Sequence, residues 1–253
     1  PTITYSPIRG EIYFRQLITP ISLDILVGAL RTITSGADPF VVLVERINGL
    51  RNPSFVDSLT TLSDSPFMRF VELFKVLYKA GVIQLAGDPE EEIAFNMVIK
   101  GYAPRYTEEV SEFLTLLELP VPADEKKGIT IPAYFAVRVG RLNGIAISTR
   151  STMDLIDIMR ASIEIPEKHV RSGLTRDYPP LGLLGQGIRI ISSEEKPKNS
   201  SLAVKYRGYW FYIAETDQKT KAFYRTLRAF WSICVTNAVD KSDAPVLTIP
   251  VGR

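Results

Sequence analysis

The chain has 253 residues, of which 45% are hydrophobic and 23% charged, with a net charge of +2. These values are typical of a folded protein with one or two domains. One cysteine, Cys234, and one histidine, His169, exclude an internal disulfide and zinc sites of the Cys₄ or Cys₂His₂ kind. The lone cysteine, a start without a signal-peptide pattern and the lack of an apolar run of about 20 residues predict a cytoplasmic protein with no membrane span.

The two halves of the chain carry opposite charge. Residues 129–253 hold 18 Lys or Arg against 11 Asp or Glu, a net charge of +7, and residues 1–128 have a net charge of −5. Such opposed halves attract each other, or the basic half faces an acidic partner. Nucleic acid is therefore one possible partner.

The front of the chain contains residues that are typical of helix starts and helix ends. Residues 3–17 alternate loosely and are expected to form a short strand or an arm. Cap residues followed by proline then predict helices that begin at residues 20, 39, 66 and 89, and Thr107 caps a fifth. The second of these is expected to end at Asn48-Gly49 and the fifth at Pro120. We expect residues 1–120 to form a mostly helical domain, and residues 121–128 to form a linker.

The pattern changes after the linker. Residues 129–139 read as an extended segment, Asn143-Gly144 as a tight turn, and the pair Ser151 and Asp154 as a capping box that opens a helix. Two strands are expected at 188–191 and 202–213, and a last strand at 246–249 in the same sheet. The sequence thus predicts an α+β protein in which residues 129–253 form a small mixed sheet packed against amphipathic helices.

The clearest element is the helix expected over residues 217–237. Its apolar residues recur at helical spacing and form a broad stripe, consisting of Phe223, Leu227, Phe230, Trp231 and Cys234. We expect this stripe to pack on the aromatic strand, against Tyr206, Trp210 and Tyr212.

Few residues point to catalysis. Glu167 lies on a different helix face from His169 and cannot orient it, so we interpret the histidine as a packing or surface residue. Cys234 falls on the apolar stripe, where a cysteine acts as a small hydrophobe. Asp217 is explained as a helix cap, and the spacing of Gly182, Gly185 and Gly187 matches no phosphate-binding loop. We therefore expect no catalytic residues, no metal and no cofactor.

A basic and aromatic segment offers an alternative. On a continuous strand, Lys205, Arg207 and Tyr209 would share one face, where cations neutralise phosphates and rings stack on bases. The opposite face of the 217–237 helix adds further cations. The candidate nucleic-acid-binding residues are Lys205, Arg207, Tyr209, Lys221, Arg225 and Arg228. Aromatic residues also favour strands for packing reasons alone, so both interpretations stay open.

Several strings resemble a family of uncharacterised bacterial proteins. They are 149–152 (Thr-Arg-Ser-Thr), 165–170, 207–213 (Arg-Gly-Tyr-Trp-Phe-Tyr-Ile), Asp217 with Thr220-Lys221, and 244–250, within a region of about residues 147–250. The family has an acidic residue where this chain has Ala214, which argues against an acidic metal site there. The resemblance implies no activity, ligand or site.

Two functions follow as expectations. The first is a non-enzymatic structural or interaction subunit of a larger intracellular assembly, which associates with itself or with other protein subunits. The second is a nucleic-acid-binding protein that uses the basic and aromatic strand together with the basic helix face.

Overall fold

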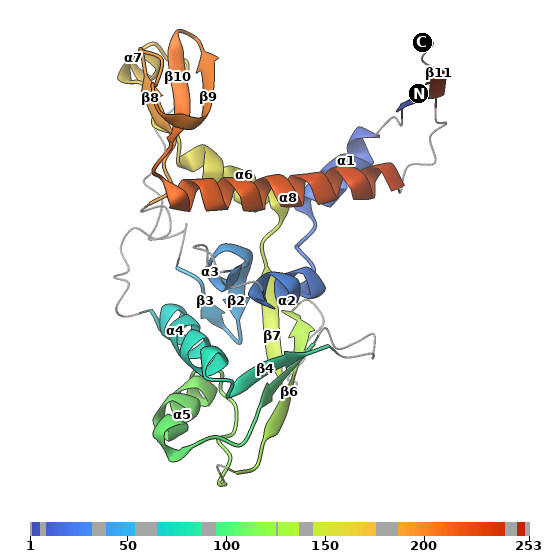
Figure 1. Cartoon of the computed structure of the whole chain (residues 1–253), viewed down its shortest axis with the longest axis vertical. Helices are drawn as coiled ribbons and strands as arrows, with labels where there is room; N and C mark the ends of the chain where they lie inside the picture. Colours follow the sequence, from blue (N-terminus) through green and yellow to red (C-terminus); the bar gives the residue numbers. More distant parts are fainter. Residues whose placement is uncertain are drawn as a thin grey trace.

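A computed structural model describes residues 2–5, 9–31, 39–53, 65–87, 95–124, 126–136, 144–175, 187–240 and 247–250. Figure 1 shows a main body built on one sheet, a layer of helices above it, and a small second sheet rising from one end of that layer. The predicted α+β class is confirmed. None of the helices in the described ranges is both long and apolar enough to span a bilayer.

The sheet of the main body is mixed and has six strands. They are β2 (Val44–Ile47), β3 (Leu50–Arg51), β4 (Ile83–Ala86), β5 (Phe95–Ile99), β6 (Ile129–Phe135) and β7 (Ile145–Thr149). The strand order is β3-β2-β7-β6-β5-β4, and among these strands only the β6–β7 pair is parallel. Because the pair is parallel, β6 and β7 do not form a hairpin. Asn143 of the tight turn predicted at Asn143-Gly144 lies outside the described residues.

The strand pairing crosses the predicted linker. β5 precedes residues 121–128, β6 follows them, and the two strands pair in antiparallel register from Phe95↔Ala133 to Ile99↔Ile129. The segment therefore connects α5 (Thr107–Leu116) to β6, within a stretch of chain that begins and ends in neighbouring strands of one sheet. The division into domains at 1–120, 121–128 and 129–253 stays a prediction.

The front of the chain contains helices at or near four of the five predicted starts, and also strands that the sequence did not reveal. Its helices are α1 (Gly10–Ile18), α2 (Leu23–Arg31), α3 (Pro39–Leu43), α4 (Pro66–Lys79) and α5 (Thr107–Leu116), with a 3-10 turn, η2, at Pro104–Tyr106. α4 begins as predicted, because the Ser65 side chain accepts a hydrogen bond from the backbone of Met68 ahead of Pro66. The interpretation of residues 3–17 as a strand or an arm missed α1.

Two other predicted helices are corrected by the structure. The helix expected from Pro39 to Asn48 ends at Leu43, and the chain continues as β2. Asn48 and Gly49 both have positive φ angles, 41° and 83°, so they form the two-residue turn between β2 and β3 and do not cap a helix. The start of the helix expected at Pro89 lies outside the described residues, and residues 95–99 of that segment form β5.

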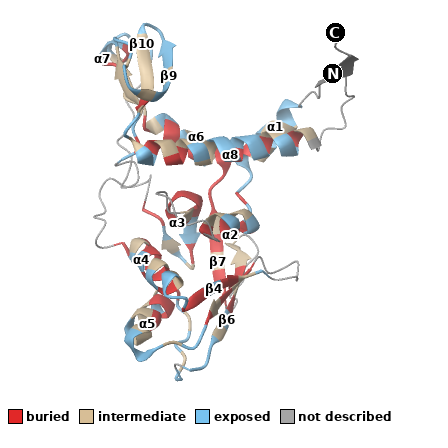
Figure 2. Cartoon of the chain, in the orientation of Figure 1, coloured by how far each residue is buried: buried red, intermediate tan, exposed pale blue. Residues whose placement is uncertain are grey.

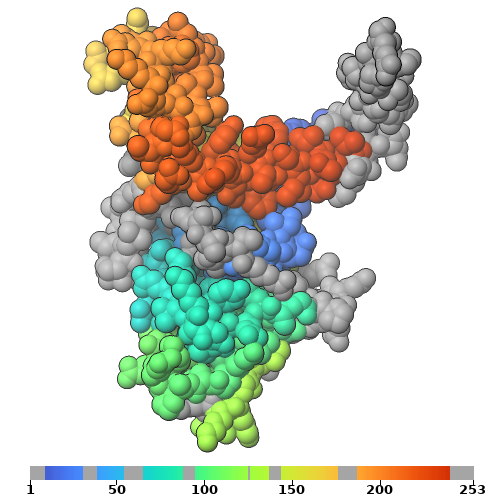
Figure 3. Space-filling view, in the orientation of Figure 1, coloured from blue at the N-terminus to red at the C-terminus, as the bar shows by residue number. Residues whose placement is uncertain are grey.

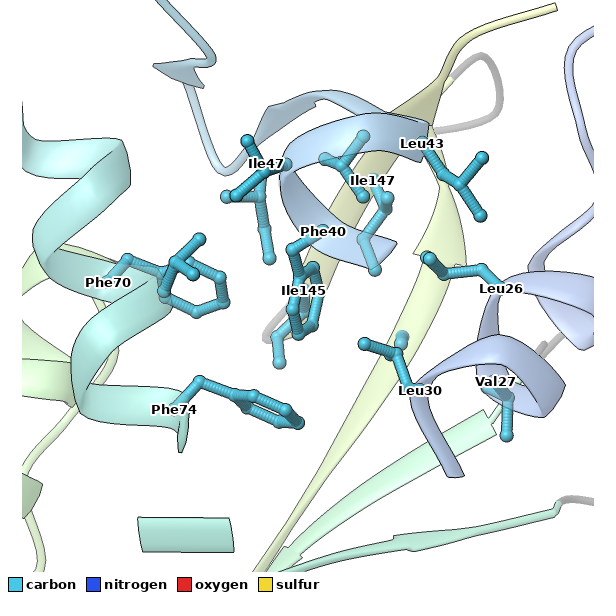
Figure 4. Packing of buried hydrophobic residues seen from close by; sticks show 14 of the residues in the cluster. Leu26, Val27, Leu30, Phe40, Leu43, Ile47, Phe70, Phe74, Ile145 and Ile147 are labelled. Carbon is cyan, nitrogen blue, oxygen red and sulfur yellow. The ribbon is translucent and has the colours of Figure 1, made fainter. Parts of the chain in front are cut away.

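A cluster of phenylalanine rings packs between the helices α3, α4 and α5 of the main body. Phe40 of α3 contacts Phe74 and Phe70 of α4 with ring centroids 4.7 and 5.3 Å apart, and Phe70 stacks on Phe113 of α5 at 5.3 Å. Figure 4 shows Phe40 between the rings of Phe70 and Phe74 and the leucines of α2, with the isoleucines of β7 beside it. Each large side chain buried in this way contributes about 1.5–3 kcal/mol to folding.

The helical layer consists of α1, α6 (Thr152–Ala161) and α8 (Gln218–Asp240), which contact one another. α6 starts with the predicted capping box between Ser151 and Asp154. α8 starts at the predicted cap, where Asp217 accepts a hydrogen bond from the Thr220 backbone at 2.9 Å. In the space-filling view α8 forms a ridge between the main body and the small sheet (Figure 3).

The stripe of α8 faces this layer and does not face the small sheet. Phe223 and Phe230 are 2% and 6% exposed and belong to the central core, while Trp231 is 42% exposed and meets the ring of Tyr13 at 5.9 Å. The expected packing on the aromatic strand is wrong, since Tyr206 is 58% exposed and Figure 1 shows the small sheet at one end of α8.

The last predicted strand belongs to another sheet. β11 (Leu247–Pro250) pairs with β1 (Thr2–Tyr5) in a separate two-stranded sheet, in antiparallel register. The two ends of the described chain therefore meet each other, which the sequence did not indicate.

Arg150 joins the body to the helical layer. Only 6% of the residue is exposed, and its Nη1 donates to the carbonyl oxygens of Val41 and Val42, each at 2.8 Å, at the C-terminal end of α3. Its backbone N–H donates to Leu43 and its carbonyl accepts from Ile21. Burial lowers the pKa of Arg150 to about 10, which still leaves a cation at neutral pH.

Replacing Arg150 tests this role. We expect Arg150→Ala to lower the free energy of unfolding by about 3 kcal/mol, because the buried carbonyl groups of Val41 and Val42 each lose a charged hydrogen-bond donor. Arg150→Lys retains one donor and is expected to lose less. Urea denaturation measures both, with Arg46→Ala on the exposed face of β2 as the control. Equal losses for Arg150→Ala and Arg46→Ala would contradict the role given to Arg150.

Candidate functional site

The small sheet has three strands in the order β8-β10-β9, which are β8 (Ile191–Ser193), β9 (Ser200–Tyr206) and β10 (Tyr209–Ala214). The continuous strand predicted over 202–213 is therefore a hairpin. Its turn consists of Arg207 and Gly208, whose φ angles are 48° and 90°. Two successive positive φ values define the tight turn that suits the twist of a hairpin.

The turn changes which side chains share a face. Tyr206 lies opposite Tyr209 and Lys205 opposite Trp210, and directly paired residues of antiparallel strands point to the same side. Lys205 and Tyr209 are therefore on opposite faces, against the prediction for a continuous strand. One face, which we call the α7 face, carries Leu202, Val204, Tyr206, Tyr209 and Phe211; the other, the indole face, carries Ala203, Lys205, Trp210 and Tyr212.

The α7 face is held by a short helix, α7 (Glu167–Arg171). His169, which is 9% exposed, places its ring edge-on to the ring of Tyr209 at a centroid distance of 5.0 Å. The hydroxyl of Tyr209 donates to Glu194 in the turn after β8 at 2.9 Å. The lone histidine thus packs against the sheet, as the sequence suggested.

A cavity of about 380 Å³ lies between this face and the α6–α7 segment. Its lining combines apolar side chains with three basic ones and includes no carboxylate; the lining residues are Arg160, Ile163, Ile165, Pro166, His169, Leu174, Thr175, Tyr206, Arg207 and Phe211. Such a lining suits an apolar group next to a negative charge. Arg160 pairs with Asp157 at 3.2 Å, and the Arg207 guanidinium lies 5.4 Å from the centre of the Tyr206 ring.

The indole face places ammonium groups near an aromatic ring. The Nζ atoms of Lys196 and Lys205 lie 5.6 and 5.9 Å from the centre of the Trp210 ring. Both distances are within the range of a cation–π contact. The positive charges and the ring of this face therefore engage one another.

The remaining predicted nucleic-acid residues lie on α8. Lys221 is committed to Glu215, since its Nζ donates to the Glu215 carboxylate at 2.7 Å and also to the Glu215 backbone carbonyl. This contact, with a hydrogen bond from Ser201, lowers the pKa of Glu215. Arg225 and Arg228 are exposed. The structure therefore distributes the six residues over the hairpin and a separate helix, and their role stays a prediction.

Other polar groups have structural partners. The Cys234 sulfur lies 3.2 Å from the Thr152 hydroxyl, buried between α8 and α6. The Thr220 hydroxyl donates to Asp217 at 2.6 Å and accepts from the Arg189 backbone at 2.9 Å. Within the described ranges, no three His, Cys, Asp or Glu side chains come together as metal ligands would.

The β9 row is the feature that sequence reasoning missed. We give this name to Leu202, Val204 and Tyr206, which are 38%, 56% and 58% exposed and lie side by side on the α7 face of β9. β9 is also an edge strand, with no further strand beside it among the described residues. Glycine at position 208 was the available signal for the turn that creates this edge.

Comparison with protein-family models, curated proteins and solved structures finds no match to this chain. The resemblance of residues 147–250 to a bacterial family therefore stays a prediction.

The contact between Tyr209 and Glu194 predicts a pH effect. Hydrogen bonding to Glu194 and then burial raise the pKa of the Tyr209 phenol above its usual 10. The bond favours the neutral phenol, so it persists below pH 10 and is lost as the pH rises through the raised pKa. We expect Glu194→Gln to return the pKa toward 10, as measured by NMR titration of ring-labelled tyrosine. Glu195→Gln is the control, and an unchanged titration in Glu194→Gln would refute the contact.

Proposed function

We propose that this chain is a non-enzymatic interaction subunit of a larger intracellular assembly, and that it associates with itself through β9. The observation that carries the proposal is the β9 row, an uninterrupted apolar row on a strand whose outer edge pairs with no other described strand. Leu202, Val204 and Tyr206 each leave more than a third of their surface in solvent.

An exposed strand edge is a template for pairing with another chain. Proteins that stay monomeric usually blunt such edges with charges, prolines or bulges. Residues 202–206 contain a single charge, Lys205, which lies on the indole face, so the apolar side of the strand is not interrupted. A bulge is present only at the far end of β9, between the pairs Ile213↔Leu202 and Ala214↔Ser200. The edge is therefore suited to strand addition.

The polar side chains that were considered as possible catalytic or metal-binding groups also favour a non-enzymatic role. His169, Cys234, Asp217 and Glu215 each have a packing, capping or ion-pair partner within the chain. These contacts account for the side chains without a reaction. The single cysteine, buried at position 234, fits a reducing compartment and hence a cytoplasmic assembly.

Val204→Asp tests the proposal. The charge in the middle of the β9 row is expected to weaken self-association at least about tenfold, because a buried unpaired carboxylate is costly. Light scattering across a range of concentrations measures the mass. Val76→Asp, at a valine of α4 that is 48% exposed, is the matched control. The proposal is contradicted if the wild-type chain remains monomeric at every concentration, or if Val204→Asp and Val76→Asp associate equally well.

A second candidate function is binding of single-stranded nucleic acid, favoured by the two lysines beside Trp210. A half-buried ring next to cations offers stacking together with phosphate neutralisation. Bases would have to replace the ammonium groups on the ring, so this function is supported less well than self-association.

The second candidate makes its own prediction. If it holds, fluorescence titration at low salt should show oligonucleotide binding that weakens steeply as salt rises. Trp210→Ala should then cost about 1–3 kcal/mol in binding, because a stacking platform is lost. The control is Trp231→Ala, at an exposed tryptophan of α8. No binding at low salt would eliminate this candidate.

A further inference from the structure

The cavity between the α7 face and the α6–α7 segment combines apolar with basic side chains. Its volume of about 380 Å³ lies near the lower end of the usual range for small-molecule sites, about 300–1,000 Å³. The apolar lining includes Ile163 and Ile165, which are half-buried in the segment between α6 and α7, and the half-buried Phe211 of β10. The cavity therefore suits a small ligand with an apolar body.

His169 brings hydrogen-bonding capacity that the described chain does not use. The residue is 9% exposed and lines the cavity, and its ring packs edge-on against Tyr209. A neutral imidazole has one donor and one acceptor, yet the ring nitrogens of His169 make no hydrogen bond with any described residue. Because buried polar groups normally have a partner, a ligand with an acceptor group would complete this side chain.

Arg207 gives the cavity a cation that no described carboxylate neutralises. Its guanidinium lies 5.4 Å from the centre of the Tyr206 ring, and it forms no ion pair within the described ranges. Arg160 also lines the cavity, but it pairs with Asp157 at 3.2 Å on the surface of α6. The basic character of the cavity therefore depends mainly on Arg207.

The other carboxylates of the surrounding elements are engaged outside the cavity. Glu164 pairs with Arg189, and Glu167 pairs with Arg171 at 2.5 Å. Glu194 accepts a hydrogen bond from a tyrosine hydroxyl of β10. None of these three carboxylates belongs to the described lining. A negative charge in the cavity would therefore meet basic side chains without an opposing carboxylate among them.

We propose that this cavity binds a small apolar monocarboxylate, of which the anion of a short fatty acid is the simplest example. Its apolar body lies against Ile163, Ile165 and Phe211. Its carboxylate accepts hydrogen bonds from His169 and from the Arg207 guanidinium, because a carboxylate has only acceptors and both side chains have donors. A monoanion also matches the one lining guanidinium that has no ion pair in the described part of the chain.

The single histidine reports binding directly. Because His169 is the only histidine of the chain, histidine ring labelling of the full-length protein without a histidine tag gives NMR signals from this site alone. Titration with octanoate should shift these signals until they saturate. Acetate lacks the apolar body and octanol lacks the charge, so each should bind at least about tenfold more weakly. Signals that do not move with octanoate, or an equal affinity for octanoate and either control, would overturn the proposal.

Arg207→Asn tests the cation. Asparagine tolerates the positive φ angle of 48° at this position, so the hairpin turn is expected to remain. The loss of a charged donor should weaken octanoate binding about tenfold and leave octanol binding unchanged. Lys205→Asn makes the same change in charge on the indole face of the same hairpin and is the matched control. Equal losses in both variants would mean that net charge alone controls binding, which contradicts the site.

His169→Phe tests the hydrogen bond from the imidazole. Phenylalanine keeps a ring against Tyr209 and removes both ring nitrogens, so octanoate binding measured by calorimetry should weaken about fivefold. Thermal unfolding checks that this variant remains folded. Unchanged affinity in a folded His169→Phe chain would contradict the role given to the histidine.

The cavity site goes beyond the self-association proposed above and does not depend on it. Val204, at the centre of the β9 row, is not part of the described lining. Val204→Asp should therefore lose self-association and still bind octanoate with the affinity of the wild type. A chain that associates but gives no octanoate response would overturn the cavity site alone, whereas a monomeric chain that binds octanoate would overturn self-association alone.

Discussion

The arrangement of the molecule depends on the buried Arg150 cation at the end of β7. The chain leaves the main sheet at this residue and enters α6, the first helix of the upper layer that follows β7. The side chain caps the carbonyls of α3, while the neighbouring Thr149 hydroxyl donates to the carbonyl of Ile21 at 2.5 Å. A buried cation is tolerated only when its donors are satisfied, so this site fixes α3, the start of α2 and the exit from the sheet together. Figure 2 shows buried residues running through this junction into the helical layer.

The parts of the fold that could be predicted from sequence are those specified by local chemistry. Ser65-Pro66 and the Ser151–Asp154 capping box set helix starts with side chains only a few residues apart, and both helices begin where expected. The apolar stripe of α8 was likewise readable from its spacing. Its partner was not, because periodicity shows that a face is buried and does not show what covers it.

The wrong predictions of secondary structure concern segments whose conformation depends on contacts or backbone angles that local sequence patterns do not reveal. Residues 40–44 are an unbroken apolar run that fits a buried helix or a buried strand, and the run divides between α3 and β2 because Arg150 and Asn52 bind the carbonyls at the change. Asn48 looked like a helix end, but its side chain bonds the Leu117 carbonyl and the Ala146 N–H, far away in sequence. Arg207 is an unusual residue at positive φ, so the hairpin was read as one strand and its two faces were assigned wrongly.

The same error explains why the interaction edge was missed. A continuous strand from 202 to 213 would have been a central element covered by α8, with its rings in the core. Folding it at Arg207-Gly208 halves its length, distributes the rings over the two faces of a hairpin and moves Leu202, Val204 and Tyr206 to an outer strand. Because the apolar stripe of α8 packs on α1, α6 and the core, it does not cover that row, whose side chains stay 38–58% exposed. The aromatic segment that first suggested base stacking thus becomes, through one tight turn, an exposed and largely apolar edge strand of the kind that pairs with another chain.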